Sequence, residues 1–120
     1  MVAIIWIMWA ANGSLLAKNE NLVAEGAKPV KLAGGFKFTE GPAIAPNGDV
    51  YFTDIPNSRV HKWDVKTKKV SLFMEKSGGA NGLFFSKEGD LFACQGESKR
   101  VTSFYLEDGG EKELLADQFD

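Results

Sequence analysis

The stretch FTEGPAIAPNGDVYFTD, residues 38–54, decides the fold because part of it returns later in the chain. The segment GPAIAPNGDVYF at residues 41–52 aligns without a gap on GLFFSKEGDLFA at residues 82–93, at an offset of 41 residues. Both copies carry Gly-Asp in front of an apolar run. This match indicates a repeated structural unit.

The repeat extends beyond these two segments. The dipeptide Arg-Val at residues 59–60 recurs at residues 100–101, again at an offset of 41 residues. In the same alignment Glu40 falls on Asn81, which places one oxygen-bearing side chain at the head of each unit. The shared unit therefore includes several successive segments.

Each unit is predicted to contain four short antiparallel strands. Side chains alternate between two faces along the apolar runs, and the turns between them carry Gly where a hairpin requires positive φ. One further edge strand is predicted at residues 28–32. Four strands recurring at about 40 residues are typical of β-propeller blades, so the sequence predicts an all-β fold. The strands expected within the two units are residues 42–45, 50–55, 59–65 and 70–73, then 83–86, 90–94, 100–106 and 113–116.

The composition narrows the class of protein. A chain of 120 residues with 44% hydrophobic and 25% charged residues is typical of an ordinary globular domain. A formal net charge of -2 provides no basic field, which argues against nucleic acid as a partner. Cys94 is the single cysteine, so an internal disulfide is excluded. We predict that Cys94 is a buried apolar thiol.

An apolar run at residues 2–11 follows the initial methionine. About ten apolar residues are too few for a membrane-spanning helix, which needs about 20, but they suit the central region of a secretory signal. We therefore predict a signal peptide at residues 1–17 and a polar linker at residues 18–27. The mature protein is then expected to be secreted or periplasmic, without a membrane segment; without a signal it would be cytoplasmic.

The folded part is predicted at residues 28–120, with blades at about residues 38–76 and 79–117. Propellers are rings of typically four to eight blades, so two blades form only part of a ring. Such a chain is expected to be the front portion of a longer protein or to assemble from several copies. Open blade faces expose apolar side chains and favour self-association. The residues assigned to these faces are Phe52, Trp63, Phe84, Phe92 and Phe104.

The order and spacing of four short motifs support a more specific interpretation. They are EGP at residues 40–42, GDVYFTD at 48–54, RVHKWD at 59–64 and ANGL at 80–83. With these motifs the chain resembles the opening of the SMP-30/gluconolactonase/luciferin-regenerating-enzyme family. The resemblance implies a six-bladed propeller with a divalent cation in its central tunnel, usually Ca²⁺, with Zn²⁺, Mg²⁺ or Mn²⁺ as alternatives. It also implies hydrolysis of a small-molecule lactone such as a sugar-acid lactone.

Two residues are assigned roles, Glu40 by the same resemblance and Asn81 by the internal repeat. Glu40 matches the family's first metal ligand, and a carboxylate suits a hard cation that prefers oxygen. Asn81, at the equivalent repeat position, is assigned to substrate binding, although Asn-Gly is also a common turn. The remaining ligands would follow residue 120, and the catalytic base stays unassigned. His61 has no recognisable nucleophile beside it, which argues against a catalytic triad.

Three functions stay open for the chain itself. The first is an N-terminal fragment of a calcium-dependent lactone hydrolase, inactive alone because one carboxylate does not make a calcium site. The second is a non-catalytic propeller module that binds a protein or sugar. The third is an inactive truncated product.

Overall fold

The computed structural model describes residues 24–118, which divide into two units at residues 30 and 31. The predicted signal peptide at residues 1–17 and the first part of the predicted linker lie outside the described residues. Of the first unit, only residues 24–30 are described, and they contain a turn. Within residues 24–118, no helix has the length and apolar character needed to cross a membrane.

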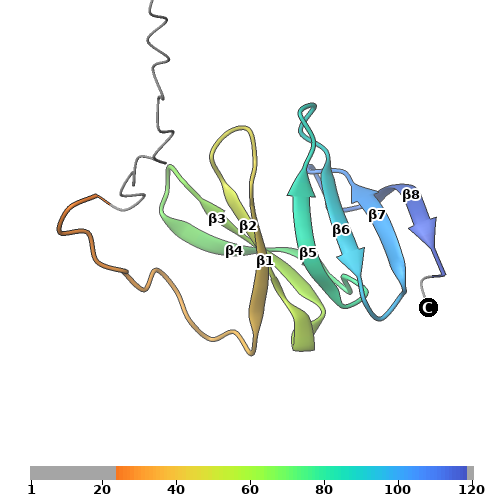
Figure 1. The fold of residues 1–120 in the computed structure, drawn as a ribbon, viewed down its shortest axis with the longest axis horizontal. Helices are drawn as coiled ribbons and strands as arrows, with labels where there is room; N and C mark the ends of the chain where they lie inside the picture. Colours follow the sequence, from red (N-terminus) through yellow and green to blue (C-terminus); the bar gives the residue numbers. More distant parts are fainter. Residues whose placement is uncertain (1–23, 119–120) are drawn as a thin grey trace, which may run out of the picture. The chain divides into compact units, whose positions relative to one another are not determined.

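The second unit contains two four-stranded antiparallel sheets (Figure 1). We call them blade 1 and blade 2. In each, the strands follow one another in sequence order, and the one helical segment within residues 31–118 is the 3-10 turn η1 (Ile55–Asn57). The predicted all-β fold is therefore confirmed. Blade 1 consists of β1 (Thr39–Ile44), β2 (Val50–Asp54), β3 (Arg59–Asp64) and β4 (Lys69–Glu75), and blade 2 of β5 (Ala80–Phe85), β6 (Leu91–Gln95), β7 (Arg100–Phe104) and β8 (Glu111–Asp117).

The first hairpin of each blade uses the turn that the sequence predicts. Gly48, between β1 and β2, has φ of 89°, and Gly89, between β5 and β6, has φ of 94°. Residues with a side chain avoid this region, whereas Gly enters it readily. The turns are also closed alike, because the Gly48 amide donates to Ala45 and the Gly89 amide donates to Ser86. The repeat therefore specifies the same hairpin twice.

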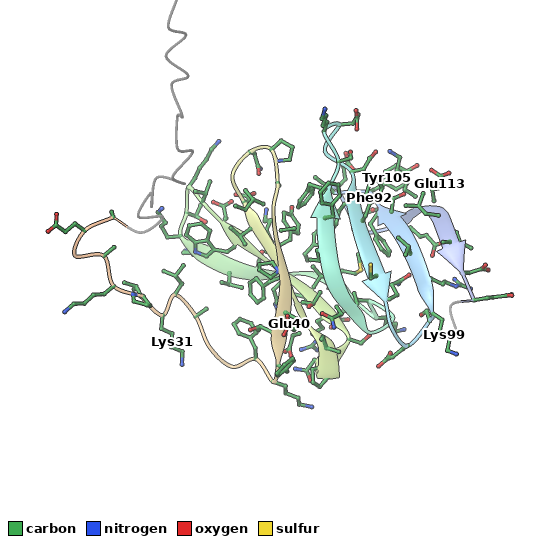
Figure 2. All side chains as sticks on the ribbon, viewed as in Figure 1. Lys31, Glu40, Phe92, Lys99, Tyr105 and Glu113 are labelled. Atoms are coloured by element: carbon green, nitrogen blue, oxygen red, sulfur yellow. The ribbon has the colours of Figure 1, made fainter. Side chains whose placement is uncertain are left out.

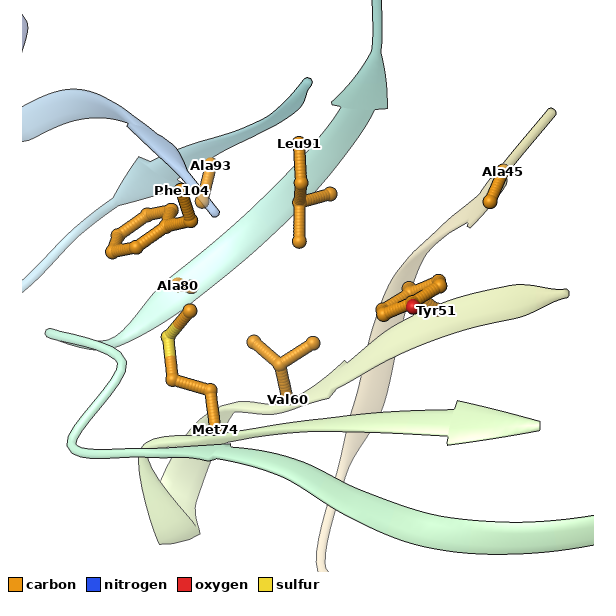
Figure 3. Close-up of a cluster of buried hydrophobic side chains, with 8 residues drawn as sticks. All are labelled: Ala45, Tyr51, Val60, Met74, Ala80, Leu91, Ala93 and Phe104. Carbon is orange, nitrogen blue, oxygen red and sulfur yellow. The ribbon is translucent and has the colours of Figure 1, made fainter. Parts of the chain in front are cut away.

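The hydrophobic core lies between the two blades (Figure 3). Val60 from β3 and Leu91 from β6 are both 0% exposed, and burial of each such side chain contributes roughly 1.5–3 kcal/mol. The rings of Tyr51 and Phe85, one from each blade, meet edge to face with centroids 5.2 Å apart. Phe104, predicted on an open face, is 5% exposed and belongs to this core. That prediction was wrong because the repeat aligns strands but does not say which blade face is covered.

Side-chain alternation along β6 gives blade 2 two different faces. Leu91 and Ala93 are buried in the core, so Phe92 and Cys94 point to the opposite side. We call this opposite side the free face of blade 2, and define it by Phe84, Phe92, Cys94 and Val101. Phe84 is 64% exposed and stacks on Phe92. Cys94 is exposed, which corrects the prediction of a buried thiol.

The strand predicted at residues 28–32 is not formed. A strand needs a neighbour to satisfy its backbone hydrogen bonds, and none of the eight described strands pairs with this segment. Residues 31–36, which also lack strand structure, run along the face of blade 1 that is turned away from the core. There the Phe36 ring meets Phe52 and His61 at centroid distances of 5.1 and 4.9 Å.

Candidate functional site

Glu40 and Asn81 lie at equivalent irregularities in the first strand of each blade. The register of β1 against β2 shifts between Glu40 and Ala43, and that of β5 against β6 shifts between Ala80 and Leu83. A β-bulge bends its strand and redirects the side chains beside it. Glu40 and Asn81 are both exposed, so each presents its oxygen to solvent (Figure 2 labels Glu40).

Gly41 allows the backbones of β1 and β5 to approach each other closely. A Cβ added at Gly41 would lie 1.9 Å from the carbonyl oxygen of Asn81 and 3.0 Å from the Cα of Gly82. The φ of Gly41 is +50°, which also disfavours a side chain. The glycine of the EGP motif is therefore required for backbone contact between β1 and β5.

Thr53 connects the same two strands through its hydroxyl group. Its Oγ1 lies 3.0 Å from the Glu40 carbonyl oxygen and 3.1 Å from that of Asn81. The hydroxyl has one proton, so the two carbonyls share a single donor. Thr53 is 0% exposed, which protects the contact from competition by water. Sequence reasoning missed this residue, because its repeat equivalent is Cys94 and no polar pattern marks the position.

The side chains of Glu40 and Asn81 offer the type of oxygen ligand that a hard cation prefers, but they are too few to form a complete site. Their carboxylate and amide oxygens are ligands that Ca²⁺ accepts, but Ca²⁺ takes six to eight oxygens. Within residues 24–118, no group of three or more His, Cys, Asp or Glu side chains could hold a metal ion. The residues present therefore fit one part of a cation site.

Two other carboxylates stabilise the backbone. Asp54, 1% exposed, accepts hydrogen bonds from the Lys37 and Phe38 amides and from the Asn57 side chain. Burial raises the pKa of Asp54, but these hydrogen bonds outweigh it and hold the pKa below its ordinary value. Asp64 accepts from the amides of the turn that follows β3. Both carboxylates therefore accept hydrogen bonds from backbone amides.

His61 packs as an aromatic side chain of the blade. Its ring stacks on Phe52 at a centroid distance of 5.5 Å, and its Nε2 is buried without a hydrogen-bond partner in the described structure. Burial lowers the pKa of His61, and the nearby Asp54 opposes that effect. His61 is thus a half-buried imidazole that packs against the rings of Phe36 and Phe52.

The family model described as "SMP-30/Gluconolactonase/LRE-like region" matches residues 38–120, more than half of the chain. The chain belongs to this family. No match was found among curated protein sequences.

Several solved structures contain a region that is similar in fold to this chain. A structural-genomics target assigned to the gluconolactonases is 36% identical, with a TM-score of 0.70, 80% of this chain covered and 33% of that chain covered. A gluconolactonase from Xanthomonas campestris is 21% identical, with a TM-score of 0.66 and coverage of 73% and 29%. Regucalcin from Agrobacterium tumefaciens, a calcium-binding protein, is 19% identical, with a TM-score of 0.61 and coverage of 71% and 32%. The chain thus spans about a third of the length of these relatives.

Proposed function

We propose that this chain supplies the first two blades, and the first cation ligand, of a metal-dependent lactone hydrolase. The observation that carries the proposal is the contact between the heads of β1 and β5. Gly41 and the Thr53 hydroxyl bring the backbones at Glu40 and Asn81 together in a chain of the gluconolactonase-like family. The relatives support the cation and substrate classes, since they include gluconolactonases and a calcium-binding protein.

The two side chains would have different tasks in the complete site. The Glu40 carboxylate would be one oxygen ligand of a divalent cation, Ca²⁺ in the first instance. A cation in such a site polarises a lactone carbonyl toward attack by water. The Asn81 amide would bind the substrate through a hydrogen bond, and amides both donate and accept. Neither residue is proposed as the base.

We expect the 120-residue chain to show no lactone hydrolysis above the spontaneous rate with Ca²⁺, Zn²⁺, Mg²⁺ or Mn²⁺. The reason is that a calcium site needs about six to eight oxygen ligands, whereas the described residues contain no group of three or more His, Cys, Asp or Glu side chains that could hold a metal ion. Hydrolysis of gluconolactone that depends on the cation and is lost in Glu40→Gln would contradict this expectation. Such a result would mean that the chain completes the site by itself or by assembly.

The role of Glu40 can be tested without turnover. Mn²⁺ titrated into ¹⁵N-labelled protein should first broaden the amide resonances near Glu40 and Asn81, because a paramagnetic ion relaxes nearby nuclei. Glu40→Gln keeps the size of the side chain but removes its charge, and should abolish this selectivity. Glu113→Gln, which replaces an exposed carboxylate on β8 (Figure 2), is the matched control and should change nothing.

A different outcome would favour the alternative of a non-catalytic binding module. If Mn²⁺ broadens acidic surface residues without preference, and Glu40→Gln behaves as Glu113→Gln does, then Glu40 has no cation role. The observation that supports this alternative is that the described residues do not include a complete set of cation ligands.

A further inference from the structure

We propose that the free face of blade 2 binds blade 1 of a second copy of this chain, in the arrangement that blades 1 and 2 adopt within one copy. The partner is identified by the internal repeat. The proposal does not depend on the proposed function, because it rests on which repeat positions are buried and which are exposed.

Residues on the free face correspond to residues that are covered inside the chain. At the offset of 41 residues, Phe92 falls on Tyr51, Cys94 on Thr53, Val101 on Val60 and Phe84 on Ala43. The blade 1 members are 4%, 0%, 0% and 8% exposed, because blade 2 covers them. On blade 2, Phe84 is 64% exposed and Cys94 is also exposed. The free face is thus the counterpart of a face that is buried when a second blade covers it.

The chain also carries a surface that could cover the free face of blade 2, on the side of blade 1 that is turned away from the core. Blade 2 covers blade 1 with Leu91 and Ala93, whose repeat equivalents are Val50 and Phe52. These two residues lie on the side of blade 1 that is turned away from the core. With Trp63 they line an apolar hollow there. The chain therefore carries both halves of one interface on opposite sides, which produces a heterologous contact between copies.

Residues 31–36 must move for this contact to form. They lie over the same side of blade 1, where Phe36 contacts Phe52 and His61. They form no strand, so their displacement breaks no sheet pairing. The covering blade replaces this short segment, which includes Leu32, Ala33 and Phe36, with a whole sheet face, and the buried apolar area increases.

The repeat also predicts which residues meet. Thr53 contacts the Asn81 carbonyl within the chain, so its equivalent Cys94 should lie beside Glu40 of the second copy. By the same rule, Gly82 should touch the backbone at Glu40 of the second copy, as Gly41 touches Asn81. The second copy would then place a further carboxylate next to the Glu40–Asn81 pair, whose own donor set is incomplete.

Thiol crosslinking tests this geometry directly. In the variant Glu40→Cys, a short bis-maleimide crosslinker should join the introduced thiol at position 40 to Cys94 of another copy at micromolar concentration, and peptide mass spectrometry should identify the pair. Adding Cys94→Ser should abolish the product. The matched control Glu111→Cys, at an exposed position on β8, should give no crosslink to Cys94.

Light scattering coupled to size exclusion provides the second measurement. The wild-type chain should elute as a dimer or larger species, and Gly82→Ala should raise the dissociation constant at least tenfold while its circular dichroism stays unchanged. A stable wild-type monomer at micromolar concentration would overturn the proposal. Crosslinks exclusively between two Cys94 residues would overturn it as well, since they would mean that two free faces pair with each other.

Discussion

Replacement of Gly41 by alanine should be among the most damaging single-methyl changes in this protein. The new Cβ would lie 1.9 Å from the Asn81 carbonyl oxygen, so β1 and β5 would have to separate. Overpacking of this kind costs about 1–3 kcal/mol, and an alanine at φ of +50° adds about 1–2 kcal/mol. We therefore expect Gly41→Ala to lower the free energy of unfolding by about 2–5 kcal/mol. That is a large share of the stability of a small domain, which is about 5–15 kcal/mol.

Gly82 is the matched control, because it occupies the same place in the second repeat. A Cβ at Gly82 would meet nothing nearer than 4.0 Å, and its φ lies outside the left-handed region. Gly82→Ala should therefore leave the stability unchanged or raise it by up to about 1 kcal/mol, through a lower entropy of the unfolded chain. Each variant adds one methyl group at a repeat-equivalent site, so the two variants have the same composition and a difference in stability must come from the surroundings of that methyl group.

Urea unfolding followed by far-ultraviolet circular dichroism measures both variants. The variants should be compared at protein concentrations low enough that all of them are monomeric, because association adds to the apparent stability. Equal losses in Gly41→Ala and Gly82→Ala would refute the reasoning, since they would mean that the β1–β5 backbone contact does not hold the blades together.

Three further outcomes are expected. Thr53→Val should cost about 1–3 kcal/mol because two carbonyls lose their donor, whereas Thr53→Ser should recover most of the loss; equal effects in urea unfolding would contradict a role for the hydroxyl. The pKa of Asp54 is lower in the folded state, so its stabilising effect is full above about pH 4 and is lost as the pH falls through the folded pKa. Unfolding curves of Asp54→Asn should therefore depend less on pH in that acidic range. If residues 1–17 are a signal peptide, secreted protein should begin between Ser14 and Lys18, and N-terminal sequencing that finds Met1 on soluble protein would exclude export.

The number, order and type of the strands could be predicted because the repeat contains them twice. Alternating side chains and the glycines at residues 48 and 89 locate the hairpins in both blades, and the eight strands of the structure overlap the eight predicted within the two units. The ninth, at residues 28–32, failed for a physical reason. Its alternation was correct for a strand, but a strand also depends on a partner that its own sequence does not specify.

The covered faces of the blades could not be predicted from alternation alone. A period of two shows that Leu91 and Phe92 point to opposite sides, but both are apolar and either could face a core. Phe104 and Cys94 were each assigned to the wrong environment for this reason. Thr53 is a related case, because threonine is common in strands and its sequence position gives no sign of a special role. Its hydroxyl reaches the Asn81 carbonyl as well as the Glu40 carbonyl because the second blade packs beside the first.

Gly41 and Gly82 occupy equivalent positions of the repeat but have different surroundings. The repeat places glycine at both positions, but only at Gly41 does the structure provide a reason for it, a backbone 1.9 Å from the missing Cβ. At Gly82 there is room for a side chain. Glycine in a strand interior weakens the strand unless another backbone approaches closely. Gly82 weakens its strand and has no close neighbour within the chain. A blade packed on the free face, where Phe84 and Cys94 are also exposed, would provide the close backbone that explains a glycine at this position. Gly82→Ala should therefore preserve the fold and weaken association, whereas Gly41→Ala should weaken the fold itself.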